Sequence, residues 1–291
     1  MKATWEHGSL NANGLRMHYV AQGQGELVVL LHGFPDFWYV WRFQIPELAK
    51  HFRVVAPDLR GYNKTDKPEG VENYRLNLLA EDVLALINTL GETKATIIGH
   101  DWGGAVAWAF AAFNPEATEK LIVLNAPHPN AYTSRAKLSL RQLQKSWYVF
   151  FFQLPDVPEK VLSRNDYSFL STMVKLSFVK KDVLTDEDLR LYKEAWSQPG
   201  ALTAMLNYYR ANMNPSILFS ERTISFPKIT SPTHVVWGEK DVALSKSLIE
   251  NTEEFLDAPY SIKYIADCGH WALLEQPKLV SEYIHEFLIT S

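Results

Sequence analysis

The segment GHDWGG contains an aspartate, Asp101, whose neighbours suggest that it takes part in chemistry. Gly99 and Gly103 flank it, between a short apolar run at 96–98 and an alanine-rich stretch at 104–113. Glycines at these positions permit a sharp turn from a strand into a helix, and such a turn exposes the central side chain. A carboxylate is already ionised at neutral pH and needs no base before it attacks. The pattern predicts a nucleophile at Asp101.

The choice of aspartate also indicates the kind of reaction. A serine that displaces a group from saturated carbon ends as an inert ether, whereas a carboxylate ends as an ester that water can cleave. Asp101 therefore favours transfer of an alkyl group over ordinary ester hydrolysis, for which a serine would be expected at this position. An aspartate here could also serve only as a helix N-cap, which would need no catalytic partners elsewhere.

Partners for such a nucleophile lie near the C-terminus. His270 follows an apolar run at 262–265, so we expect it on a loop at the carboxyl end of a strand, where it can act as a general base. An acid must orient this histidine, and both Glu239 and Asp241 follow the run at 233–237. We favour Asp241 over Glu239, although both could be solvated loop residues.

Two backbone N–H groups are expected to form an oxyanion hole opposite the turn. His32-Gly33-Phe34-Pro35 ends a buried run, which predicts that the Phe34 amide lies beside that of Trp102. These amides would stabilise the charge that develops when water attacks an ester on Asp101. The sequence leaves open whether the Phe34–Pro35 peptide bond is cis.

These residues need a scaffold, and the hydrophobic pattern indicates one. A helical pattern at 78–90 that ends at Gly91 comes directly before the run that leads to Asp101. Alternation of short runs with helical patterns is typical of a parallel sheet with crossover helices. The expected strands, each predicted to be buried on both faces, lie at 28–31, 53–56, 96–98, 120–124, 233–237 and 262–265.

The alternation stops after Pro127 and resumes at Pro232, and the residues between show helical spacing and many aromatic side chains. A connection of this length usually carries structure and function of its own. We therefore expect a helical cap at 129–225 inserted into an α/β core that comprises 1–128 and 226–291.

Composition limits the class of protein. The chain has 291 residues, of which 47% are hydrophobic, and a net charge of -4 without a long basic run, which argues against nucleic acid as a partner. We find no signal-like N-terminal segment and no apolar run long enough for a bilayer, so we expect a soluble cytoplasmic protein. Cys268 is the only cysteine, so the chain cannot form an internal disulfide.

The motifs together resemble those of the epoxide hydrolases of the α/β-hydrolase superfamily over nearly the whole chain. They are HGFP, DLRGYNKTDKP, GHDWGG and DCGHW. The resemblance implies an α/β-hydrolase fold, with a mostly parallel central sheet flanked by helices and an inserted helical cap. It further implies that an epoxide opens to a vicinal diol through a hydroxyalkyl ester on Asp101, and that water activated by His270 and Asp241 then cleaves this ester. No metal or organic cofactor is required.

The same resemblance implies two cap tyrosines that support the departing epoxide oxygen. The segments WYVFFFQLP and LNYYR place them at Tyr148 and Tyr209, although Tyr208 is adjacent and only one of these neighbours on a helix can face the nucleophile. Aromatic residues around the site predict a small hydrophobic epoxide as substrate, and a packed cap interior would explain the cap aromatics equally well. The expected substrate-binding residues are Phe34, Trp102, Trp147, Phe151 and Trp271.

Other functions on this fold remain open at this point. A haloalkane dehalogenase would share Asp101 and Trp102, but that family often has an asparagine where this chain has Phe34. A leaving halide also has no use for paired tyrosines. A non-catalytic ligand receptor is the least expected alternative, since it would have little need for a complete catalytic set. Monomer and homodimer are equally compatible with the sequence.

Overall fold

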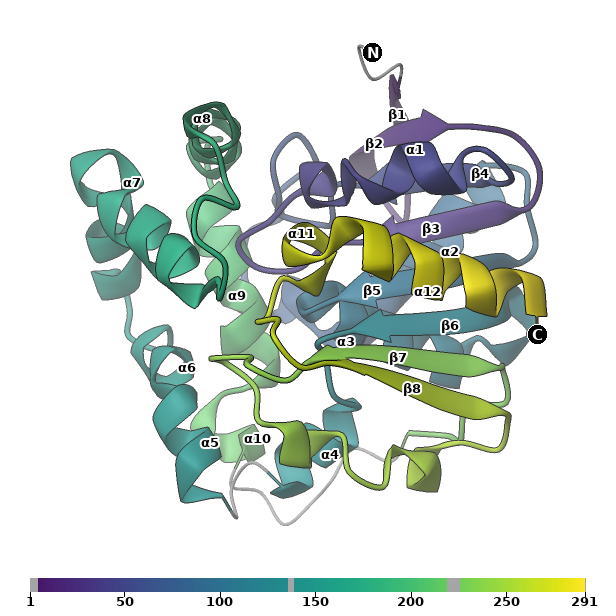
Figure 1. The fold of residues 1–291 in the computed structure, drawn as a ribbon. Helices are drawn as coiled ribbons and strands as arrows, with labels where there is room; N and C mark the ends of the chain where they lie inside the picture. Colours follow the sequence, from purple (N-terminus) through teal and green to yellow (C-terminus); the bar gives the residue numbers. More distant parts are fainter. Residues whose placement is uncertain (1–4, 136–138, 219–225, 291) are drawn as a thin grey trace.

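The computed structural model describes residues 5–135, 139–218 and 226–290, and its centre is one sheet of eight strands (Figure 1). The strand order is β1-β2-β4-β3-β5-β6-β7-β8, and all pairs from β4 to β8 are parallel. The strands are β1 (Glu6–Ala12), β2 (Leu15–Gln22), β3 (Leu27–Leu31), β4 (Arg53–Pro57), β5 (Ala95–His100), β6 (Thr118–Leu124), β7 (Thr233–Gly238) and β8 (Tyr260–Ile265).

The central strands follow the predicted pattern, and the last strand does not. Every residue of β3, β5 and β7 is buried, as expected for parallel strands that are covered on both faces. The prediction that the run at 262–265 is buried on both faces is wrong. β8 has only one neighbouring strand, and the Tyr264 side chain is 40% exposed because β8 forms the edge of the sheet.

The N-terminal hairpin is an element that our sequence reading missed. β1 and β2 pair antiparallel, with Ala12 opposite Leu15, and the turn between them consists of Asn13 and Gly14, both with positive φ. Asn-Gly is the preferred sequence for such a two-residue turn, so the signal was present. The strand itself was hard to recognise because β1 (EHGSLNA) contains no β-branched apolar residue.

Helices cover both faces of the sheet. In Figure 1, α12 lies in front of the strands and α3 behind them; α1 packs against α12, and α2 packs against α3. No helix within the described ranges combines the length and the apolar character needed to cross a lipid bilayer. The core helices are α1 (Gln44–Leu48), α2 (Leu76–Thr89), α3 (Trp102–Phe113), α11 (Ala272–Glu275) and α12 (Pro277–Thr290).

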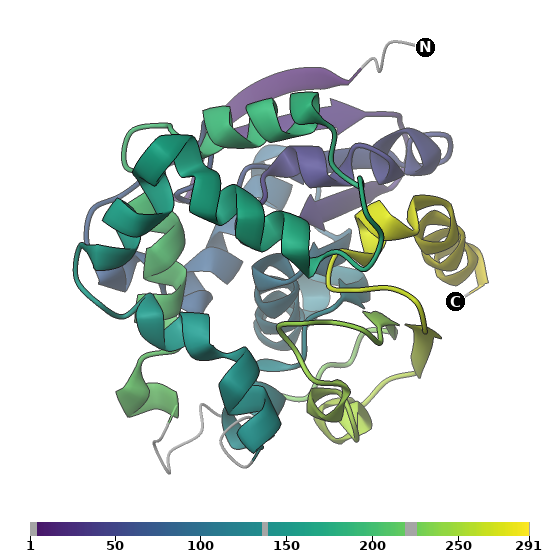
Figure 2. The ribbon, with the colours of Figure 1, turned by 60° about the vertical axis from the view of Figure 1, so that its left-hand side comes forward.

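A helical segment joins β6 to β7 and lies beside the carboxyl ends of the strands, as Figures 1 and 2 show. Its first helix packs against α3, and α9 packs against α2 and against the short helix at Val71–Tyr74. The predicted boundary near 225 lies outside the described residues. The helices are α4 (Pro129–Arg135), α5 (Leu140–Lys145), α6 (Trp147–Phe151), α7 (Val157–Ser177), α8 (Asp186–Trp196), α9 (Ala201–Asn212) and α10 (Pro215–Leu218).

Candidate active site

Asp101 occupies a strained turn between β5 and α3. Its φ of 53° and ψ of -121° are unusual for a residue with a side chain. A Cβ on Gly99 would lie 2.2 Å from the carbonyl oxygen of Gly103, and a Cβ on Gly103 would lie 2.2 Å from that of Leu31. Only glycine fits at these two positions, and the resulting backbone contact directs the Asp101 side chain away from the sheet.

The Asp101 carboxylate contacts two of its expected partners. The Phe34 amide donates a hydrogen bond to Oδ1 at 2.7 Å, and His270 Nε2 lies 3.3 Å from Oδ2. The Phe34–Pro35 peptide bond is cis. Trp102, the second predicted amide donor, directly follows Asp101, but the described structure records no hydrogen bond from its amide to this carboxylate. One of the two predicted donors therefore already points at the reacting carboxylate.

Asp241, and not Glu239, contacts the histidine. Its Oδ2 lies 2.7 Å from His270 Nδ1, and Asn125 Nδ2 donates to the same oxygen at 2.9 Å. The Ala243 amide and the Leu244 amide donate to its other oxygen, Oδ1, at 2.7 and 2.8 Å.

By contrast, Glu239 pairs with Lys246 at 2.6 Å on the surface. The loop after β7 is thus folded around the Asp241 carboxylate, and this carboxylate orients the imidazole toward Asp101. The preference for Asp241 over Glu239 agrees with this geometry.

The charges of these three groups stabilise one another. Burial alone would raise the pKa of Asp101, but the hydrogen bond and the charge of His270 outweigh it and hold that pKa below its ordinary value. The pKa of Asp241 is lowered in the same way, against burial, by His270 and by the loop amides. Burial disfavours the imidazolium, yet the two carboxylates raise the pKa of His270 to about 10. At neutral pH the resting site thus holds an imidazolium between two carboxylates.

Two tyrosines from the helical segment lie in the same cavity as Asp101. Tyr148 on α6 and Tyr209 on α9 both line the cavity that contains Asp101, and their ring centroids are 5.8 Å apart. Burial is the main cause that raises the pKa of both phenols well above the ordinary value, and the negative charge of Asp101 adds to the increase, so both stay protonated and can donate. The neighbouring Tyr208 is fully buried and donates its hydroxyl to the Arg60 carbonyl at 2.7 Å, away from the site.

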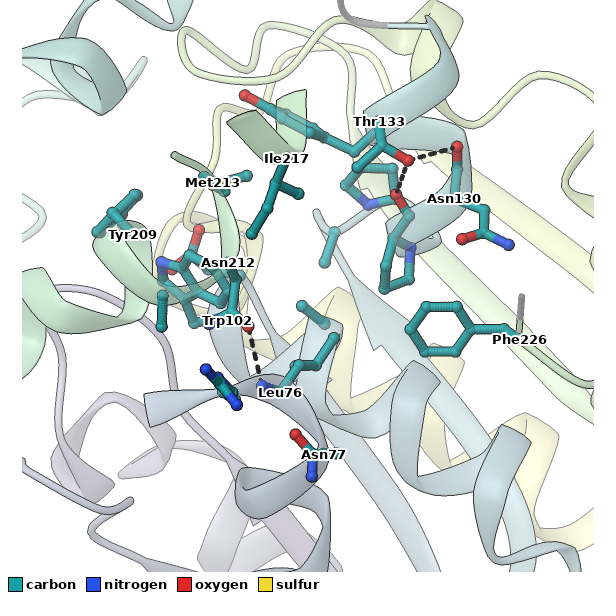
Figure 3. A pocket seen from close by; sticks show the side chains of 18 of the residues that line it. Leu76, Asn77, Trp102, Asn130, Thr133, Tyr209, Asn212, Met213, Ile217 and Phe226 are labelled. Atoms are coloured by element: carbon teal, nitrogen blue, oxygen red, sulfur yellow. Dashed lines mark hydrogen bonds between the residues drawn. The ribbon is translucent and has the colours of Figure 1, made fainter. Parts of the chain in front are cut away.

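The cavity at Asp101 has a volume of about 480 Å³ and is lined mainly by apolar side chains. Figure 3 shows Trp102 and Tyr209 at one end and Phe226 and Asn130 at the other, with Ile217 and Met213 between them. A space of this size accommodates a drug-sized organic molecule. Among the described residues, no group of three or more His, Cys, Asp or Glu side chains is placed to hold a metal ion.

Comparisons with known proteins agree with this geometry. The family model for the alpha/beta hydrolase fold matches residues 26–277. Human epoxide hydrolase 4 is 41% identical over 95% of this chain and 76% of its own length, and the AB hydrolase superfamily protein YfhM of Bacillus subtilis is 45% identical over 96% of both chains. The crystal structure of Bacillus megaterium epoxide hydrolase in complex with an inhibitor has a TM-score of 0.90, with 34% identity over 97% of this chain and 99% of that one. The chain belongs to the epoxide hydrolases of the α/β-hydrolase family.

Membership of the epoxide hydrolases confirms the family and fold that the motifs predicted, and the substrate-binding residues stay a prediction. Among the described residues, the lining of the Asp101 cavity includes Trp102 but not Phe34, Trp147, Phe151 or Trp271. Trp147 is 51% exposed on the outer side of α6. Trp271 is buried and donates its indole N–H to Asp36 at 2.9 Å. This cavity therefore gives no support to substrate binding by these four side chains.

Our sequence reading of this epoxide hydrolase also missed residues that support the site. Asn125 directly follows β6, has a positive φ and hydrogen bonds both Asp241 and Gly238, so a polar residue directly after a buried strand was the available signal. His100, next to Asp101, donates to the His270 carbonyl at 2.9 Å, and burial lowers its pKa to about 4. Asp36 accepts from Tyr192 at 2.8 Å, and burial raises its pKa to about 7.

Proposed function

We propose that this protein opens epoxides to vicinal diols through a hydroxyalkyl ester on Asp101. The observation that carries the proposal is the combination of an ionised Asp101 with two protonated tyrosines, Tyr148 and Tyr209, in one cavity. A carboxylate nucleophile alone is compatible with several leaving groups. Paired hydroxyl donors suit a leaving group that stays attached to the substrate and must receive a proton, as the oxygen of an epoxide must.

In the first step, an Asp101 oxygen attacks a ring carbon and the bond from that carbon to the epoxide oxygen breaks. Tyr148 and Tyr209 hold this oxygen, and one of them gives it a proton, which leaves a hydroxyalkyl ester and a tyrosinate. The ester has no negative charge, so His270 loses one of the two carboxylates that raise its pKa. His270 then returns a proton to the tyrosinate through solvent and becomes neutral.

In the second step, neutral His270 takes a proton from water while the water oxygen attacks the ester carbonyl. The Phe34 amide donates to the oxygen that gains charge, and the Trp102 amide is the second candidate donor. The intermediate collapses with cleavage of the bond between the carbonyl carbon and the alcohol oxygen. The new carboxylic acid passes its proton to the departing alcohol. The diol leaves, and Asp101 and His270 are again an ion pair.

We further propose that residues 129–225 act as a cap domain on a core of 1–128 and 226–291. The cap contributes Tyr148 and Tyr209, and the core contributes Asp101 and His270, so neither part holds a complete site. The mainly apolar cavity suits a hydrophobic epoxide whose substituent extends along Ile217 toward Phe226.

Intact mass measurement of a His270→Gln variant tests the proposal. This change blocks activation of water, so the ester should accumulate when the variant meets an aryl or alkyl epoxide. We expect an adduct equal to the whole mass of the epoxide, and peptide mapping should place it on Asp101. An adduct that forms only with haloalkanes and lacks the halogen would overturn the proposal in favour of a dehalogenase.

A further inference from the structure

Gln142 on α5 is a buried glutamine with no exposed surface. Its side-chain amide hydrogen bonds the acid loop, which is the loop after β7 that carries Asp241. Its Oε1 accepts a hydrogen bond from the Ser245 amide at 2.8 Å, and its Nε2 donates to the Ala243 carbonyl at 2.8 Å. The two bonds engage both a donor and an acceptor of the same loop. In a sheet, a neighbouring strand satisfies backbone N–H and C=O groups in this way. Here the Gln142 side chain satisfies one of each in the loop.

The part of the acid loop that Gln142 bonds also supplies the backbone amides that bond Asp241. The Ala243 amide donates to Asp241 Oδ1, while the Ala243 carbonyl accepts from Gln142. Leu244 lies between Ala243 and Ser245, the two residues bonded by Gln142, and its amide donates to the same Asp241 oxygen. Lys145, one turn further along α5, donates to the Asp241 carbonyl. The direction of the loop amides, and hence of the carboxylate, depends on contacts from α5.

We propose that Gln142 is a positioning residue through which the cap sets the orientation of Asp241, and thereby the basicity of His270 in ester hydrolysis. This inference rests on the proposed function. It assigns to the cap a role in the second step, in addition to the role of Tyr148 and Tyr209 in the first.

Loss of the Gln142 amide should slow mainly the second step, hydrolysis of the ester. Gln142 Nε2 also donates to Ser146, the residue directly before α6, at 3.0 Å. However, other contacts hold the helix that carries Tyr148. Arg210 Nε donates to the Phe152 carbonyl at 2.9 Å, and Gln153 Nε2 donates to the Tyr209 carbonyl on α9 at 3.3 Å. Loss of the Gln142 amide should therefore disturb the acid loop more than it disturbs Tyr148.

The pH dependence of hydrolysis gives a direct readout of this role. Once Asp101 is an ester, Asp241 is the main carboxylate that still raises the pKa of His270. A displaced Asp241 would let that pKa fall, so the acidic limb of the hydrolysis rate should move to lower pH while the plateau rate falls. The charged or titratable groups around this pair come from several elements. They are Asp101 at the turn after β5, His100 on β5, Asp36 after β3, Lys145 on α5, Tyr148 on α6 and Cys268 after β8.

The test uses the full-length Gln142→Met variant, which keeps the length of the side chain and removes the amide. Single-turnover experiments with an aryl epoxide would measure ester formation and ester hydrolysis separately across pH. We expect hydrolysis to slow by about ten- to hundredfold, with its acidic limb at lower pH. Ester formation should change by less than about threefold.

Gln153→Met is the matched control, because Gln153 also donates from the cap to backbone carbonyls but does not contact the acid loop. Suppose that Gln142→Met and Gln153→Met hydrolyse the ester at similar rates and that the acidic limbs of their rate profiles lie at the same pH. Gln142 then only stabilises the cap, and the inference is wrong. Should Gln142→Met fail to fold, Gln142→Asn, which retains the amide but reaches less far, would answer the same question. An unaltered protein that forms no ester would contradict the proposed function instead.

Discussion

The turn that carries Asp101 and the cap that carries the tyrosines hold their reactive groups in different ways. At the turn, backbone atoms of β3, β5 and α3 approach so closely that Gly99 and Gly103 leave no space for a Cβ. In the cap, side chains make the contacts, as when Arg210 pairs with Glu159 at 2.7 Å and Gln142 bonds the acid loop. The backbone contacts at the turn do not tolerate a larger residue, whereas each side-chain contact in the cap can be changed by a single substitution. The proposed nucleophile, Asp101, is thus held rigidly, whereas the cap side chains proposed to assist it are held by contacts that can change individually.

The largest effect should follow removal of the nucleophile from the turn. Asp101→Ala keeps the backbone and removes the carboxylate that would form the ester, so turnover should fall by about 10⁴-fold or more. Epoxide consumption and intact mass would be measured together. Covalent adducts on the alanine variant, or turnover within about tenfold of the unaltered protein, would contradict nucleophilic attack by Asp101.

A methyl group at the backbone contact should be the next most damaging change. In Gly103→Ala, the new Cβ would lie 2.2 Å from the Leu31 carbonyl oxygen, so β3 and α3 must separate. We expect the free energy of unfolding to fall by about 3 kcal/mol or more, with a parallel loss of turnover. Gly91→Ala is the control, because Gly91 has a φ of 85° but no atom within 4 Å of its added Cβ. Chemical denaturation should give a loss of only about 1 kcal/mol for the control, and equal losses would show that close approach is unimportant.

Changes to the cap tyrosines should have intermediate effects. Tyr148→Phe and Tyr209→Phe each remove one of two donors to the epoxide oxygen, so ester formation should slow by about ten- to hundredfold. The double variant should be slower than either. Tyr208→Phe supplies the control, because the Tyr208 hydroxyl bonds the Arg60 carbonyl and does not face the cavity. Pre-steady-state measurement of ester formation checks these rates, and full activity in both single variants would refute the assignment.

The smallest effect at neutral pH concerns the charges around the turn, because it develops only as the pH rises. The folded protein raises the pKa of His270 from 6.5 to about 10. The resulting stabilisation is complete below about pH 6.5 and is lost as the pH rises through about 10. Between these pH values, the free energy of unfolding of the unaltered protein should fall by about 4 kcal/mol more than that of His270→Gln, with a correspondingly larger fall in Tm. Thermal unfolding of both proteins across pH 6 to 10 would show this. Parallel curves would mean that His270 is not an imidazolium in the resting state.

Much of the core could be predicted because its signals are local. The apolar run before Asp101, the glycines around it and the stretch after it predict a strand, a turn and a helix without reference to any distant residue. The structure has β5 and α3 in these places. The hairpin of β1 and β2 was missed because β1 is largely polar and exposed, although Asn13-Gly14 marked its turn. The edge position of β8 depends on strand order, which no local pattern states.

The cap could be predicted as helical, but the directions of its side chains could not. Tyr208 and Tyr209 are adjacent, and only the packing of α9 against α2 and the core decides that Tyr209 reaches the cavity. For the same reason, Trp147 was expected in the pocket and lies at the surface. A helical pattern identifies an apolar face, but it does not state which residues on that face meet a cavity.

The sequence by itself therefore determined the fold class and the strand, turn and helix around Asp101, because the signals for these elements lie in short segments. Only the tertiary structure decided that Asp241 rather than Glu239 meets His270, and that Gln142 from the cap holds the loop of that acid. These contacts join residues from 29 to 103 positions apart in the chain. They depend on how whole elements pack, and no local spacing specifies that packing.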